Sequence, residues 1–151
     1  MENLSADGVL TNVISLSKSF TLHRRTIRVR KPVILFSASD GCFGYFRTPM
    51  EFEAMLLETM MKADSIQGWQ DGILKRLAEI SGDDFTFCGF AFGFGSYENM
   101  KKSLARRTLA VFETYMKDIE TKSRDELMQM WYGYKPEYSR YLSDAYPVVD
   151  V

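Results

Sequence analysis

The sequence changes abruptly from a strand-like to a helix-like pattern around residue 40. Val33–Ser37 is a short apolar run entered through Pro32, and its continuous apolarity predicts a strand buried on both faces. Soon after it, Thr48-Pro49-Met50-Glu51 combines a capping box with proline at the first helical position, which predicts the start of a helix. A buried strand that delivers the chain into helices favours an α+β fold.

The remaining segments continue this mixed pattern through a single expected domain, residues 1–151. Apolar residues at helical spacing, interrupted at Asp64-Ser65, predict two consecutive helices that end at Ser81-Gly82. Aromatic and small residues from Asp83 to Gly95 predict another buried strand. Further expected elements are strands at 8–16 and 20–30, a long helix at 96–122, a short helix at 123–131 and one helical turn after Pro136. The expected fold is an antiparallel sheet packed with helices.

Composition narrows the chemistry that such a domain can perform. The only histidine is His23, and the two cysteines, Cys42 and Cys88, lack the companions that a zinc site needs. Histidine-based nucleophilic catalysis is therefore nearly excluded, so any catalysis must use carboxylates, a metal or groups from another chain. The net charge of −1 gives no general attraction to nucleic acid or to an anionic membrane. No apolar run is long enough to span a membrane, and a cytoplasmic location is expected.

A basic stretch, His23–Lys31, is the local feature that suggests nucleic-acid or phosphate binding. Within it, Arg28 and Arg30 alternate with apolar residues, as on the solvent-facing side of an edge strand, where charge also discourages aggregation. We therefore interpret this stretch as a solvated face, and we expect no nucleic-acid partner.

Two aspartates occupy matching places at the ends of the expected buried strands. Asp40 follows one strand and leads into the helices, whereas Asp83 leaves the helices and enters the next strand. If these strands share a sheet, both carboxylates reach the same rim, where they repel each other unless a cation or proton lies between them. Mg²⁺ and Mn²⁺ prefer such oxygen ligands. A simpler interpretation stays open, because Asp40-Gly41 is also ordinary turn chemistry, with glycine at a positive φ.

Two short motifs surround the aspartates, SASDG at residues 37–41 and SGDDFT at residues 81–86, and the first is followed by CFGY at 42–45 and TPMEFE at 48–53. Together they resemble the metal-dependent protein serine/threonine phosphatases of type 2C, in a bacterial variant. Ser37–Gly41, SASDG, is similar to the ASDG motif of that family. Ser81–Thr86, SGDDFT, is similar to its DN-x-T motif, which lies near the last strand. The resemblance implies that Asp40 and Asp83 are ligands of one Mn²⁺ or Mg²⁺ ion in a two-metal centre.

The resemblance also implies supporting residues, a fold and an activity. Gly41, Asp84 and Thr86 would support the metal ligands, with Asp84 standing where asparagine is commoner and Thr86 orienting a neighbouring backbone group. The implied fold is part of an α/β/β/α sandwich. The implied reaction is hydrolysis of phosphoserine and phosphothreonine in proteins by a water molecule that two metal ions activate, with no further catalytic side chain named.

The match covers about residues 8–95, and the N-terminal half of the family's domain has no counterpart. Missing with it are a metal-bridging Asp-Gly-x-Gly-Gly motif and a phosphate-binding arginine. We therefore expect a chain that is weakly active or inactive alone and that pairs with the missing half or with itself. The alternative, from a different class, is a non-catalytic phosphatase-like module that regulates or binds other proteins.

Overall fold

Five helices pack with a small antiparallel sheet in the part of the chain that the structure describes. The structure, a computed structural model, describes the backbone of residues 32–145 and the side chains of residues 32–140. Its elements are β1 (Val33–Ala38), α1 (Asp40–Phe43), α2 (Pro49–Lys62), α3 (Ile66–Ile80), β2 (Phe87–Phe92), α4 (Tyr97–Val111) and α5 (Arg124–Ala145). The expected α+β class is confirmed. The strands expected at 8–16 and 20–30 and the basic stretch His23–Lys31 lie outside the described residues.

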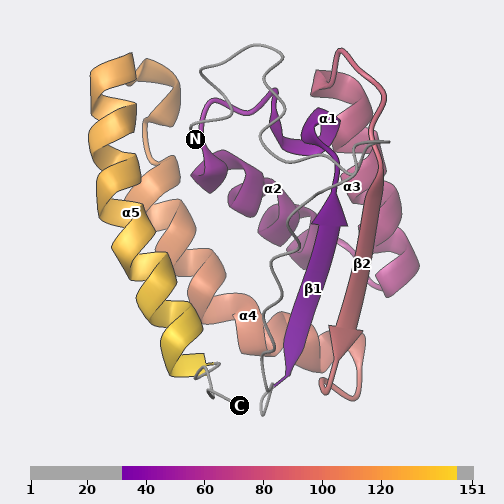
Figure 1. Cartoon of the computed structure of the whole chain (residues 1–151). Coiled ribbons are helices and arrows are strands. Elements are labelled where there is room, and N and C mark those ends of the chain that lie inside the picture. The colour runs from indigo at the N-terminus through magenta and orange to yellow at the C-terminus, as the bar shows by residue number, and fades with distance from the viewer. Residues whose placement is uncertain (1–31, 146–151) are drawn as a thin grey trace, which may run out of the picture.

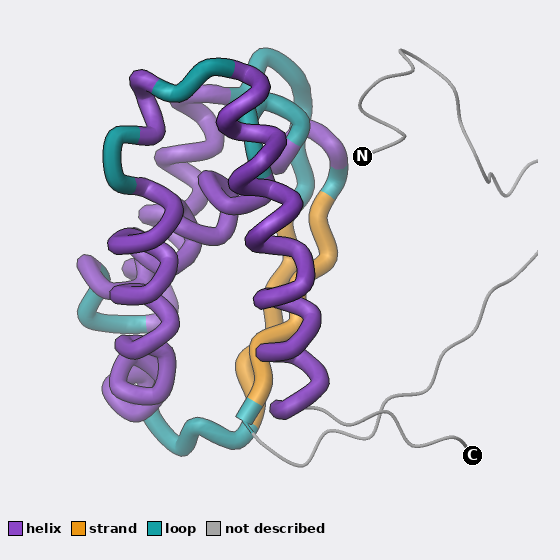
Figure 2. Tube along the Cα trace, turned by 90° about the vertical axis from the view of Figure 1, so that its left-hand side faces the viewer, coloured by secondary structure: helices purple, strands orange, loops and turns teal. Residues whose placement is uncertain are grey.

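β1 and β2 pair antiparallel, in a register that runs from Val33 opposite Phe92 to Ala38 opposite Phe87. β1 therefore ends where β2 begins, and Figure 1 shows α1 at this shared end of the sheet. Most of the helices lie to one side of the two strands (Figure 2). On that side Phe36 meets the ring of Trp69 edge-on, with 5.9 Å between the ring centroids.

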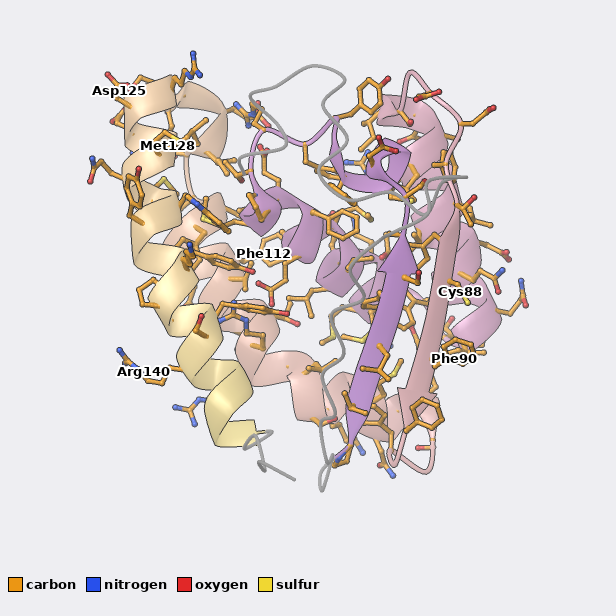
Figure 3. The ribbon with its side chains drawn as sticks, viewed as in Figure 1. Cys88, Phe90, Phe112, Asp125, Met128 and Arg140 are labelled. Carbon is orange, nitrogen blue, oxygen red and sulfur yellow. The ribbon has the colours of Figure 1, made fainter. Side chains whose placement is uncertain are left out.

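The opposite face of the sheet carries apolar side chains that the described residues leave exposed. Leu35, Phe90 and Phe92 retain 51%, 57% and 54% of their accessible surface. The rings of Phe90 and Phe92 stack with an interplanar angle of 17°. Cys88 and Phe90, labelled in Figure 3, lie on β2 at the side of the molecule away from α5. The expectation that β1 is buried on both faces and the expectation that β2 is a buried strand are therefore wrong for the described part of the chain.

Helix α2 lies at the centre of the core, where it packs against α3 and α4. Its start is the predicted one, because Thr48 Oγ1 accepts a hydrogen bond from the Glu51 amide and Glu51 in turn accepts one from the Thr48 amide. These reciprocal bonds satisfy two amide groups that a helix N-terminus leaves free. The buried apolar side chains of the helical core include Met50, Met55, Met60, Trp69, Ile73, Leu77, Met100 and Val111. None of the helices within residues 32–145 has the length and apolarity that crossing a membrane requires.

The long helix expected at 96–122 is interrupted. Helix α4 ends at Val111 and continues as a π-helical turn, Phe112–Met116, followed by a separate 3₁₀ turn, Ile119–Thr121. Asp118 between them has a φ of 56°, a left-handed conformation that ends the helical path. Apolar periodicity alone does not indicate such a turn, so the predicted helix was too long.

Helix α5 is longer than the short helix expected at 123–131. Its capping box is the predicted one, with the Ser123 amide donating to Glu126 over 2.8 Å. The helix then continues to Ala145 with Pro136 inside it, although proline removes one backbone hydrogen bond and normally interrupts a helix. Residues on both sides of the proline, Tyr134 and Glu137, hold the helix against the core.

These two residues belong to a charged cluster around the buried Arg107, and the cluster joins α2, α4 and α5. Arg107 of α4 is only 7% exposed and donates two hydrogen bonds to Glu53 of α2, over 2.8 and 2.7 Å, and one to Glu137, over 2.6 Å. Tyr134 Oη donates to Glu53 over 2.7 Å, and Tyr115 Oη donates to Glu137. Burial by itself would lower the pKa of Arg107, but the hydrogen bond and charge of Glu53 raise it instead. This cluster anchors α5.

Candidate metal-binding site

The pairing of β1 with β2 brings both aspartate-bearing segments to one end of the sheet. Beyond the last ladder pair, Ala38 opposite Phe87, the Ser39 amide donates to the Thr86 carbonyl over 3.0 Å. The Thr86 amide donates back to Ser39 Oγ over 2.9 Å. The segment that contains Asp40 and the segment that enters β2 are thus hydrogen-bonded to each other although helices α2 and α3 separate them in the chain.

Gly41 lies in direct contact with the second segment. A Cβ atom at this position would lie 2.4 Å from the carbonyl oxygen of Asp84, far closer than ordinary van der Waals contact. Ser81 Oγ lies 3.0 Å from the Gly41 carbonyl oxygen and 2.9 Å from that of Asp83. Gly41 is the second residue of the short helix α1 and has no positive φ, so the expected turn with glycine at a positive φ was wrong here. The glycine is required here by space.

Cys42 is a site residue that the sequence analysis missed. Its side chain is 1% exposed, and its thiol donates to the Thr86 carbonyl over 3.1 Å, beside the bond from Ser39. The spacing of Ser39 and Cys42, about one helical turn, was the available signal, because it places both side chains on one face of a helix start. That spacing predicts contacts with Thr86 only if it is already known that β2 begins beside Ser39.

The carboxylates of Asp40 and Asp83 belong to exposed residues and can be reached from solvent. Each accepts one hydrogen bond from the following amide: Gly41 donates to Asp40 Oδ1 over 3.0 Å, and Asp84 donates to Asp83 Oδ1 over 2.8 Å. Carboxylate oxygens are the donors that Mg²⁺ and Mn²⁺ prefer, so the chemistry of this pair fits part of a hard-cation site. Among the described side chains, however, no group of three or more acidic, histidine or cysteine residues could hold a metal.

The supporting residues named from the sequence act through their backbone groups. Asp84 contributes the carbonyl against which Gly41 packs and an amide that binds Asp83. Thr86 contributes both its amide and its carbonyl to the contact with Ser39. The five residues proposed from sequence therefore lie on two segments in contact with each other.

A groove of about 360 Å³ adjoins this site on the helical side of the molecule. Tyr45 lines it and also reaches the site, since its Oη lies 3.1 Å from the position of a Cβ on Gly82. Its two arginines, Arg47 and Arg76, are already paired with glutamates, Arg47 with Glu51 and Glu120. The groove therefore offers a phosphate group no unpaired arginine.

Comparison with protein-family models, with curated proteins and with solved structures finds no match to this chain.

Proposed function

We propose that this chain carries part of the metal centre of a phosphatase that hydrolyses phosphoserine and phosphothreonine in proteins, as the resemblance to the type 2C family implies. The observation that carries the proposal is the hydrogen-bonded contact between the two motif segments, which Ser39 and Thr86 make. Two independent sequence likenesses, far apart in the chain, meet at one end of the sheet.

In this proposal Asp40 and Asp83 hold a Mn²⁺ or Mg²⁺ ion between them. The bound metal supplies a more acidic water molecule and offsets charge on the phosphoryl oxygens. Gly41 allows the two segments to approach, and the backbone of Thr86 holds them in register. Both aspartates are exposed, so a phosphorylated segment of a protein substrate can approach them.

Two carboxylates hold a hard cation weakly, so the proposal places the remaining ligands on another polypeptide segment. The finer fold, one half of an α/β/β/α sandwich, belongs to the same proposal. It is supported by the exposed apolar face of the sheet, with Leu35, Phe90 and Phe92, because such a face is a usual site of association. The partner is then the missing N-terminal half or a second copy of the chain.

One observation favours the rival function, a non-catalytic module. The described side chains provide no group of three or more acidic, histidine or cysteine residues that could hold a metal. A scaffold that regulates or binds another protein needs no metal. The rival therefore expects Mn²⁺ to have no preferred position near Asp40.

Titration with Mn²⁺, followed by the loss of amide NMR signals near the paramagnetic ion, separates the two functions. The phosphatase proposal expects the signals of Gly41 and Asp84 to broaden together at millimolar Mn²⁺ or below. Asp40→Asn and Asp83→Asn should each abolish this selective broadening. The matched control is Asp71→Asn, because Asp71 is also exposed but lies in the half of α3 remote from the site. Uniform broadening, or broadening that persists in Asp40→Asn, would support the non-catalytic module.

Hydrolysis of p-nitrophenyl phosphate gives a second test. We expect the chain alone to show almost no Mn²⁺-dependent turnover, because two carboxylates form an incomplete centre. Robust turnover that disappears in Asp40→Asn would show that the chain holds a complete site.

A further inference from the structure

Ser39 occupies the junction at which strand β1 becomes helix α1. In a regular antiparallel pair, Ser39 and Thr86 would exchange two backbone hydrogen bonds. The first of these bonds is present, because the Ser39 amide donates to the Thr86 carbonyl over 3.0 Å. The second bond would join the Thr86 amide to the Ser39 carbonyl. That carbonyl does not make it, because it accepts the Cys42 amide over 3.0 Å and so begins α1. The Thr86 amide would therefore lack its usual strand partner.

The hydroxyl of Ser39 takes the place of its own carbonyl. The Thr86 amide donates to Ser39 Oγ over 2.9 Å. Serine at a helix N-cap normally turns its hydroxyl back onto the helix, as Ser65 does for α3 and Ser96 for α4. Ser39 stands at the N-cap of α1 and makes no such bond. Its hydroxyl accepts the amide of the neighbouring strand instead, and it also lies 4.0 Å from Cys42 Sγ.

This exchange of acceptors lets the sheet continue for one more pair while the helix begins at the next residue. Asp40 follows Ser39 directly, so its backbone is held against the segment that carries Asp83. The Cys42 thiol adds a second donor to the Thr86 carbonyl on the same contact. An alanine at position 39 would keep the backbone bond and remove the cross-strand acceptor, together with the 4.0 Å contact to Cys42 Sγ.

We propose that Ser39 is a positioning residue whose hydroxyl sets the separation of Asp40 and Asp83, so that both carboxylates can bind one divalent cation. The inference rests on the proposed function, because it concerns the same site. Removing a group that orients a metal ligand typically lowers metal affinity by about 10- to 100-fold. We expect Ser39→Ala to lower the Mn²⁺ affinity of this chain by about tenfold.

A purely structural role for the hydroxyl makes different predictions, and two further variants expose them. Ser39→Thr keeps a hydroxyl and should restore Mn²⁺ binding to near the wild-type affinity. Ser96→Ala is the matched control, because it also removes one serine hydroxyl that accepts a backbone amide, from Asn99 over 3.2 Å. It should shift the urea unfolding midpoint in the same direction as Ser39→Ala and leave Mn²⁺ affinity unchanged.

Hydrogen exchange of the Thr86 amide without metal gives a readout that does not depend on the proposed function. Ser39→Ala should speed this exchange by about tenfold, because the amide loses its acceptor, whereas Ser96→Ala should not affect it. The Mn²⁺ affinities come from broadening of the Gly41 signal.

The outcomes separate the two claims. If Ser39→Ala binds Mn²⁺ as well as the wild type, or if Ser96→Ala weakens binding equally, the positioning role is wrong while the proposed function stands. If the wild type itself has no Mn²⁺ site at Asp40 and Asp83, the proposed function fails, and the positioning role that rests on it fails with it. Faster exchange at Thr86 with weaker Mn²⁺ binding and rescue by threonine supports the proposal.

Discussion

Replacing Gly41 by alanine tests the contact between the two motif segments at its tightest point. The new Cβ would lie 2.4 Å from the Asp84 carbonyl oxygen and 3.2 Å from both the Asp84 carbonyl carbon and the Phe85 Cβ. Comfortable contact needs about 3.5 Å, so the segments must separate by about 1 Å. The atoms in the way belong mainly to the backbone, so a change of rotamer cannot relieve the overlap.

The expected loss of stability follows from this overlap and from the effect of alanine on the unfolded chain. Overpacking of this kind costs about 1–3 kcal/mol, and the reduced freedom of the unfolded chain returns about 0.4–1 kcal/mol. We therefore expect Gly41→Ala to lower the free energy of unfolding by about 1–2 kcal/mol, measured by urea denaturation. Because the segments carry Asp40 and Asp83, Mn²⁺ binding should weaken as well.

Gly133→Ala is the control for the general effect of replacing a glycine. Gly133 lies inside α5, and an added Cβ would have no atom within 4 Å. Alanine should therefore stabilise the chain by about 0.5–1 kcal/mol through its higher helix propensity. A Gly41→Ala variant that is as stable as the wild type and binds Mn²⁺ equally well would refute the reasoning.

Three further predictions concern the rest of the molecule. Arg107→Ala should lower the free energy of unfolding by about 3 kcal/mol, because it removes the cation that offsets the charges of Glu53 and Glu137, whereas Arg106→Ala, at an exposed position, should change it little in the same urea assay. Burial, followed by the hydrogen bond to Glu137, raises the pKa of Tyr115 from 10.0 to about 12. The folded state then holds a proton that the unfolded state has lost, so stability should fall between about pH 10 and pH 12, less steeply in Tyr115→Phe. Finally, Phe90→Ser should reduce self-association of the chain in sedimentation experiments, and a wild type that is a stable monomer would contradict this.

Local signals predicted the helix starts well. The capping boxes at Thr48 and Ser123 form as expected, because their hydrogen bonds join residues only three positions apart. The order of strand and helix around Asp40 was predicted for the same reason. The local pattern could not predict that α5 continues through Pro136. The helix is supported there by the ion pair of Glu137 with Arg107, a residue of another helix.

In the candidate site, too, features set by neighbouring residues were predicted and features set by another element were not. The sequence pointed to Asp40 and Asp83 through two short motifs, and the pairing of β1 with β2 brings their segments into contact. Ser39 and Cys42 were missed, because their roles depend on the partner strand and not on their sequence neighbours. The burial of β1 and β2 was overestimated, because an apolar run does not show which segment covers each face of a strand. Among the described residues no segment covers the face that carries Leu35, Phe90 and Phe92.

A double-mutant cycle of Mn²⁺ binding tests the central claim, that Asp40 and Asp83 share one cation, most directly. Mn²⁺ dissociation constants would be measured for the wild type, Asp40→Asn, Asp83→Asn and the double variant. A shared ion predicts that each single substitution removes most of the binding and that the double variant binds scarcely more weakly than either. Losses that simply add, or an Asp83 segment that still binds Mn²⁺ in Asp40→Asn, would show that the two carboxylates act at separate places.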